Sequence, residues 1–131
     1  MISFGGSSDS DYDVSYGALA KALNVPEATY KSQCSSLEYK QLDKNANNHI
    51  NENVTFTGEI LQIAEENNVT IMRIATSGSY DDVMYVTYFN TTSHVEGDTV
   101  TVWGLISGSE TYTSQANYQI TIPSMNAVYV E

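Results

Sequence analysis

One segment of the sequence places oxygen-bearing side chains at the spacing of a calcium-binding loop. Every second residue falls at a ligand position of an EF-hand: Asp43, Asn45, Asn47, His49 and Asn51. Asn48 stands where that loop needs its glycine, and Val54 stands where it needs the bidentate glutamate. Calcium would lose its strongest ligand, and Val54 begins a strand pattern where the loop needs a second helix. We therefore predict an Asn-rich turn here and no metal site.

Two other groups of residues could in principle do catalytic chemistry. Asp81 and Asp82 follow Tyr80 and form a carboxylate pair of the kind used in general acid–base catalysis or metal binding, but no third partner lies nearby in the sequence. Cys34 is the single cysteine, and a thiol nucleophile needs a basic partner. His49 and His94 are the only histidines, and neither lies in a recognisable nucleophile context. We predict no catalytic residue, no cofactor and no enzymatic activity.

Aromatic side chains near strand patterns are the best candidates for ligand contact. The chain has ten tyrosines and one tryptophan. Aromatics are favoured in strands for packing alone, and they also stack on flat ligands. The candidate ligand-binding set joins the aromatics to the carboxylate pair: Tyr80, Asp81, Asp82, Tyr85, Tyr88, Trp103 and Tyr112.

The charge of the chain excludes one class of ligand. Sixteen acidic residues against five basic ones give a net charge of −11, and residues 45–131 hold ten carboxylates and a single cation, Arg73. A groove that follows phosphates needs Lys and Arg, so we do not expect direct binding of nucleic acid or of anionic membranes. Such charge also fits an acidic inhibitor that mimics nucleic acid. No apolar run reaches the length of a membrane-spanning helix, and residues 1–6 do not read as a signal peptide.

The texture of the sequence changes along the chain. Residues 1–14 are rich in Gly, Ser and Asp and predict a flexible acidic leader. Residues 15–44 predict short helices, with Asn24 and Pro26 ending the first and Pro26 starting the next. Leu37 and Leu42 are expected to face inward. Residues 15–131 thus read as one domain whose N-terminal helices pack against one end of a β-structure.

Period-two alternation predicts five main strands after residue 52. They are expected at 53–64, 69–76, 82–89, 98–106 and 118–122. Residues 65–68 predict a turn, 112–113 a short edge piece and 127–130 a last short strand after Pro123. Gly58 lies inside the first strand, where a barrel strand bends or bulges. The pattern predicts an all-β, five-stranded OB-like barrel with a short N-terminal helical segment, and a small sandwich is the alternative.

Several segments in order resemble a known family. They are residues 30–42, 53–65 (NVTFTGEILQIAE), 80–88 (YDDVMYVTY), 96–104 (EGDTVTVWG), 111–114 and 120–123. Together, over about residues 30–131, they resemble the OB-like β-barrel domain of secreted, lipid-anchored or membrane-tethered proteins of Gram-positive bacteria and their phages. The resemblance implies a fold and an outward-facing location, and it implies no reaction. The chain departs from the family at residues 43–53, and we expect neither a lipid-attachment cysteine nor a signal leader among the given residues.

Three functions are compatible with these observations. The first is a non-enzymatic binding or accessory module, extracellular or attached to the cell envelope, that recognises a protein, a glycan or another small non-phosphate ligand. The second is the acidic nucleic-acid mimic, which would gather its carboxylates in one row. The third, a hydrolase, has no supporting motif. A cytoplasmic location is the alternative, and the oligomeric state is not encoded in any pattern we recognise.

Overall fold

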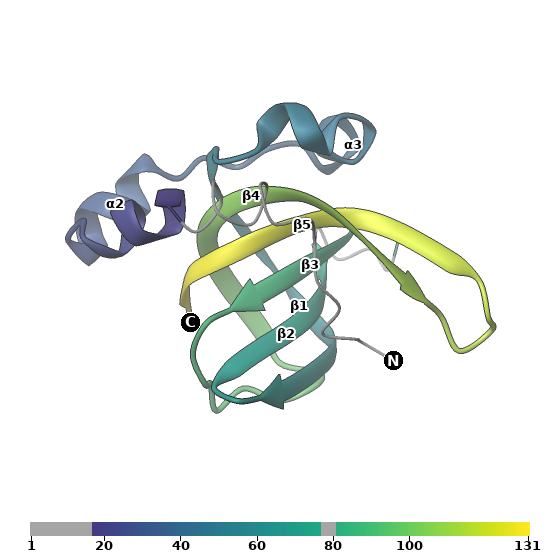
Figure 1. The fold of residues 1–131 in the computed structure, drawn as a ribbon. Helices are drawn as coiled ribbons and strands as arrows, with labels where there is room; N and C mark the ends of the chain where they lie inside the picture. The colour runs from purple at the N-terminus through teal and green to yellow at the C-terminus, as the bar shows by residue number, and fades with distance from the viewer. Residues whose placement is uncertain (1–16, 77–80) are drawn as a thin grey trace.

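The computed structural model describes residues 17–76 and 81–131, so the leader predicted at 1–14 and the candidate Tyr80 lie outside the described residues. Five strands form a closed barrel in the order β1-β2-β3-β5-β4 (Figure 1). They are β1 (Asn53–Glu66), β2 (Val69–Thr76), β3 (Val83–Tyr88), β4 (Thr99–Thr113) and β5 (Gln119–Val130). The helices are α2 (Glu27–Gln33), α3 (Tyr39–Lys44) and the 3-10 turn η1 (Ala46–His49), with residues 17–23 also helical.

A tight hairpin joins β1 to β2. Its two central residues, Asn67 and Asn68, have φ angles of 53° and 64°. A two-residue hairpin turn needs both residues in the left-handed region, which asparagine tolerates better than other side chains that carry a Cβ. Glu65 and Glu66 pair with Thr70 and Val69 and therefore end β1. The prediction that both glutamates belong to the turn is wrong.

The first strand closes the barrel because it pairs with two neighbours. Gly58 lies opposite Thr76 of β2 and Val100 of β4, and a Cβ on Gly58 would come within 2.1 Å of the Ala75 carbonyl oxygen. The bulge predicted at Gly58 lies further on, between Ile60 and Gln62. The extra residue shifts the alternation, so that Ile63 and not Gln62 follows Ile60 in packing against the core.

The last two strands are longer than predicted. Residues 112–113 belong to β4, and Pro123 lies inside β5 instead of ending it. A proline is tolerated in a strand where its missing N–H faces no partner, and β3 begins to pair with β5 only at Ser124. Residues 109–113 of β4 and 119–123 of β5 therefore pair with each other beyond the barrel, and we call this two-stranded extension the arm (Figure 1).

The barrel interior holds the main core. Its fully buried side chains come from all five strands and include Ile60, Ile74, Met84, Val102 and Met125. From the helical segment, Tyr39, Leu42 and Ala46 join the same cluster, and the Tyr39 hydroxyl donates to the Val83 carbonyl at 2.8 Å. The prediction that helices pack at one barrel end is confirmed for α3 and η1, which fill that end.

The earlier helical residues pack elsewhere. Leu19, Ala22 and Tyr30 form a separate cluster with Leu105 and Val128 on the outer wall of β4 and β5. The Lys31 ammonium lies 4.2 Å from the centroid of the Trp103 ring and also bonds to the carboxylates of Glu27 and Glu131. This contact fixes α2 to the outer wall of the barrel, which corrects the expectation that all of the N-terminal helical segment packs against the barrel end.

The close approach at Gly58 gives the first prediction. Gly58→Ala should lower the free energy of unfolding by about 2 kcal/mol or more, because backbone atoms of β2 cannot move aside for the new methyl group. Gly17→Ala is the matched control: nothing lies within 4 Å of its added Cβ, and helix propensity should raise stability by up to about 1 kcal/mol. Urea unfolding followed by circular dichroism measures both. Equal midpoints for the two variants would contradict the tight crossing.

Candidate functional site

The structure separates the residues that the sequence grouped as ligand-binding. Trp103 lies on the outer wall under α2, where its ring packs against Lys31. Tyr88 is half-buried at the end of β3 and packs against the main core. Asp81 and Asp82 lie in the turn before β3, where the Asp82 carbonyl accepts bonds from the backbone N–H and the hydroxyl of Thr76, each at 2.8 Å. Trp103 and Tyr88 thus belong to clusters other than the one that holds Tyr85 and Tyr112.

Tyr85 and Tyr112 are brought together. Tyr112 on the inner side of the arm and Tyr85 on the outer side of β3 belong to one apolar cluster with Ile71, Val83 and Ile122. The arm thus folds over the outer face of β2 and β3. In an OB barrel this face commonly binds the ligand. Here the two rings are only 4 % and 8 % exposed, so they serve the packing of the arm and offer no stacking platform.

Arg73 of β2 connects the barrel to the arm. Its Nη1 donates to the Tyr112 hydroxyl at 2.9 Å, its Nε donates to Gln62 at 2.9 Å, and its guanidinium carbon lies 5.0 Å from the Tyr112 ring centroid. The single cation of residues 45–131 is therefore engaged by its own neighbours in β1 and β4. It contributes to the internal contact between the barrel and the arm.

Burial under the arm changes the acidity of two groups. Loss of hydration, with a smaller contribution from the charge of Glu110, raises the pKa of Tyr85 to about 12. Loss of hydration also raises the pKa of the Glu110 carboxyl above its ordinary value. Glu110 lies two residues before Tyr112 on the same side of β4. The inner side of the arm thus carries one carboxyl group that is partly desolvated.

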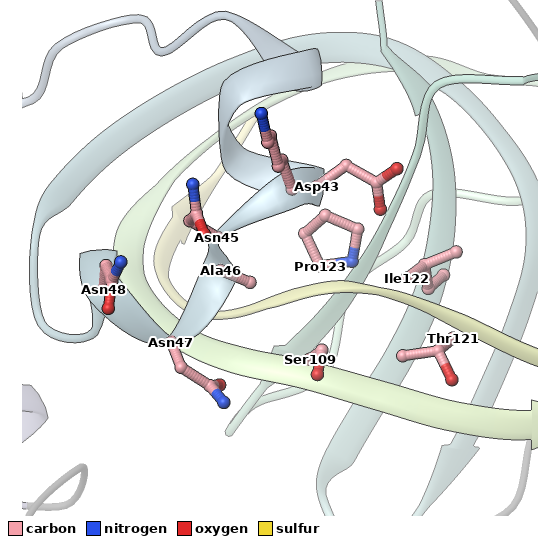
Figure 2. A pocket seen from close by; sticks show the side chains of 10 residues that line it. Asp43, Asn45, Ala46, Asn47, Asn48, Ser109, Thr121, Ile122 and Pro123 are labelled. Atoms are coloured by element: carbon pink, nitrogen blue, oxygen red, sulfur yellow. The ribbon is translucent and has the colours of Figure 1, made fainter.

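The outer side of the arm borders a hollow of about 410 Å³. Figure 2 shows Asp43, at the end of α3, extending toward Pro123 and Ile122 of β5, while Ser109 and Thr121 line the arm side. The Asn-rich turn closes the remaining side, with Asn45, Asn47 and Asn48 among the lining residues. This is the segment whose spacing resembles a calcium loop. Within the described residues, no group of His, Cys, Asp and Glu is placed to hold a metal ion.

Two contacts position the turn against the arm. The Asn51 N–H donates to the Ile106 carbonyl at 2.8 Å, and the Ile106 N–H donates to the Glu52 carbonyl at 3.1 Å. Gly108 has a φ of 114°, and a Cβ there would lie 3.0 Å from the Asn47 side-chain oxygen. Because Gly108 has no side chain, η1 can lie directly against the base of the arm. Together with the two hydrogen bonds to Ile106, this contact positions the asparagines that line one wall of the hollow.

The groups considered for nucleophilic chemistry are far from forming a catalytic site. The Cys34 thiol bonds to the Tyr30 carbonyl at 3.5 Å, and burial raises its pKa, which disfavours the thiolate. His49 lies 2.6 Å from Glu52, and His94 lies 3.4 Å from Asp98, on different loops. Neither histidine is paired with the cysteine in the described structure. Of the helices it describes, none combines the length and hydropathy required to span a membrane.

Comparison with known proteins identifies the fold. No protein-family model and no curated protein matches this sequence. The solved structures that are similar to this chain include the following three. The aspartyl tRNA synthetase of Entamoeba histolytica superimposes with a TM-score of 0.52 at 8 % identity, over 82 % of this chain and 22 % of the synthetase. An OBody bound to hen egg-white lysozyme gives 0.50 at 12 % identity, over 73 % of this chain and 92 % of the OBody.

The third is the mitochondrial single-stranded DNA-binding protein Rim1 of S. cerevisiae, with a TM-score of 0.42 at 17 % identity, over 60 % of this chain and 91 % of Rim1. This chain spans about a fifth of the length of the synthetase. At such low identity the two structures with TM-scores of 0.52 and 0.50 establish the fold alone. The chain is an all-β OB-like barrel, as the sequence predicts.

Replacing the Tyr112 hydroxyl tests the contact between arm and barrel. Tyr112→Phe removes the acceptor of the Arg73 Nη1 bond and should cost about 1 kcal/mol of folding free energy, because a half-buried donor loses its partner. Tyr118→Phe is the matched control, since Tyr118 is 71 % exposed at the tip of the arm and should change little. Chemical unfolding compares the two. The contact is unimportant if both variants unfold at the wild-type midpoint.

The buried carboxyl group predicts a pH dependence. Because the pKa of Glu110 is raised in the folded state, folding favours the protonated form, and the ionised form weakens the fold as pH rises above an unfolded value of about 4.3. Glu110→Gln should therefore exceed wild type in stability at neutral pH, and the difference should shrink as pH falls toward about 4. Urea midpoints between these pH values measure it. Glu66→Gln, at the exposed end of β1, is the control for the loss of one carboxylate charge.

Proposed function

We propose that this chain is a non-enzymatic binding module that recognises a protein or another non-phosphate ligand outside the cell or at the envelope of a Gram-positive bacterium. The location follows from the family resemblance of residues 30–131. The binding role is supported by one observation above others: β4 and β5 continue past the barrel as an arm whose outer side is polar, uncharged and free of core contacts. Catalysis has no comparable support among the described side chains.

The chemistry of the barrel argues for a ligand without phosphate groups. Arg73 is engaged by Gln62 and Tyr112, and the two tyrosines on the usual ligand face are buried by the arm. A strand of nucleic acid would therefore meet neither free cations nor open rings on that face. OB barrels also serve protein recognition, as in the OBody bound to lysozyme. Among the described residues the most exposed aromatic side chain is Tyr118, at the tip of the arm, with 71 % of its surface exposed, and Phe89 follows with 38 %.

The placement of the carboxylates argues against the acidic mimic. Glu52 precedes β1 and Glu66 ends it, so these two charges lie at opposite ends of a 14-residue strand. Glu110 lies on the inner side of the arm and is partly buried, and Glu131 bonds to Lys31. A mimic of a phosphate backbone would align its charges on one face. The observed scatter fits a surface whose charge serves solubility.

Retention on immobilised protein tests the proposal. The wild-type chain is incubated with envelope and cytosolic fractions of a Gram-positive bacterium at low and then high salt. We expect an envelope component to remain bound at high salt, and we expect Tyr118→Ser to lose it because the exposed ring is removed. Leu23→Ser is the matched control, because Leu23 is 58 % exposed on the helical side of the barrel.

Three results would count against the proposal. Release of the partner at moderate salt would favour the acidic mimic, because ionic contacts between exposed groups are screened. Loss of binding in Leu23→Ser but not in Tyr118→Ser would move the contact from the arm to the helices. Absence of any retained component would contradict a binding module of this kind.

A further inference from the structure

We propose that the hollow beside the arm binds an uncharged saccharide, and that the outer side of the arm extends this site along a glycan chain. This inference rests on the proposed binding function and names its ligand class. It starts from the lining of the hollow, which combines hydrogen-bonding groups from α3, η1 and the arm with a buried apolar floor.

The polar groups of the hollow match the needs of a sugar. A sugar ring presents several hydroxyl groups, each both a donor and an acceptor, and amides, hydroxyls and a carboxylate can satisfy them in either sense. The exposed polar side chains that line the hollow are Asp43, Asn45, Asn47, Asn48, Ser109 and Thr121. Asp43 and Lys44 bring opposite charges, so the hollow as a whole carries no net charge.

The floor supplies an apolar contact. Ala46 and Pro123 are buried and line the hollow, and Ile122 borders it as well, although it packs mainly in the apolar cluster with Tyr112. The C–H faces of a sugar ring are apolar and pack against such side chains while the ring hydroxyls reach the walls. Figure 2 shows Pro123 and Ile122 side by side, with Asp43 above them and Thr121 beyond. A volume of about 410 Å³ lies within the range of small-molecule sites in proteins.

The outer side of the arm continues this chemistry away from the hollow. The Thr111 and Thr121 hydroxyls bond to each other at 2.7 Å, and the Gln119 amide donates to the Thr113 hydroxyl at 3.1 Å. These side chains are exposed, and none is charged. Tyr118 stands at the far end with its ring in solvent. The chain has a net charge of −11, but this surface presents neutral hydroxyl and amide groups. A neutral polymer can therefore bind here through hydrogen bonds without contacting charged side chains.

A different occupant would need different chemistry. The centre of a protein interface is usually enriched in aromatic residues, Met and Arg, whereas the outer side of the arm between Ser109 and Thr121 presents hydroxyls and amides. A phosphate ligand would need cations, and Lys44 is the one cation at the hollow, next to Asp43. The combination of a neutral polar wall and an apolar floor favours a saccharide.

Titration with defined oligosaccharides tests the site. The probes are the β-1,4-linked hexamers of N-acetylglucosamine and of glucose, added to ¹⁵N-labelled full chain and followed by amide chemical shifts. We expect one of them to shift residues 43–48, 109–113 and 119–123, with an affinity unchanged between low and high salt. The double variant Thr111→Val/Thr121→Val should weaken binding about tenfold, since each lost hydrogen bond contributes modestly.

The chain offers a matched control for that variant. Thr57 of β1 and Thr101 of β4 form another exposed cross-strand hydroxyl pair, at 2.8 Å, on the barrel itself. Thr57→Val/Thr101→Val has the same chemistry and should bind the hexamer as wild type does. Equal losses in both double variants would indicate a general effect of the substitutions and overturn the assignment.

Other outcomes separate this inference from the proposed function. If neither hexamer shifts the hollow while an envelope component is still retained through Tyr118, the saccharide site is wrong and the binding module stands. Shifts centred on Tyr85 and Arg73 would place the ligand on the β2–β3 face and also overturn the site. Binding that weakens steeply with salt would identify an ionic ligand and contradict a neutral one. Failure of both experiments would remove both proposals.

Discussion

The pairing of β4 with β5 beyond the barrel is the constraint on which the other features of this surface depend. Inside the barrel each of these strands has a second neighbour, β1 or β3, but from residue 109 to 113 and from 119 to 123 they pair only with each other in the described structure. An isolated two-stranded ribbon is only marginally stable in water. Packing against another part of the chain is therefore required to stabilise the arm, and one of its sides packs on the outer face of β2 and β3.

That contact decides which face of the barrel is available. The inner side of the arm supplies Tyr112 and Ile122, the barrel supplies Ile71 and Tyr85, and Arg73 bonds to the Tyr112 hydroxyl at their boundary. Burying apolar surface offsets the cost of ordering the arm and of desolvating Glu110. In consequence, a face that is open for ligands in many OB barrels is filled here by the chain itself. The outer side of the arm and its tip stay exposed, and there we propose that recognition occurs.

The helical residues before β1 pack against two different parts of the barrel. Tyr39, Leu42 and Ala46 close one end of the barrel, and the turn that follows lies on the base of the arm because Gly108 leaves room for it. The residues around Leu19 and Tyr30 cover the outer wall, where Lys31 is held between aromatic rings and carboxylates. Because α3 and η1 close one end of the barrel, they lie next to β5, and the hollow beside the arm forms between them. It is a product of how the elements pack together.

The fold class and most strand positions could be predicted from the sequence. Alternating patterns placed β2 and β3 within a residue of their observed bounds, and Gly58 lies where β1 closely approaches β2. The ratio of Asp and Glu to Lys and Arg argued against a phosphate ligand. These features are local, so periodicity and composition reveal them. The same reasoning missed the length of β4 and β5, because it treated Pro123 as a strand end without knowing that β3 pairs only from Ser124 onward.

Which candidate residues contact one another became clear from the three-dimensional arrangement of the strands. Seven ligand-binding residues were proposed from their types, yet within the described chain Tyr85 and Tyr112 alone form a common cluster, and they are buried. Arg73, Glu110, Ser109 and Thr121 were not among the seven. The alternation of Ser109, Thr111 and Thr113 indicated one polar face of a strand. It gave no indication of which other elements lie beside that face. Contacts between residues far apart in the chain depend on how strands register and fold over one another, and no local pattern records that.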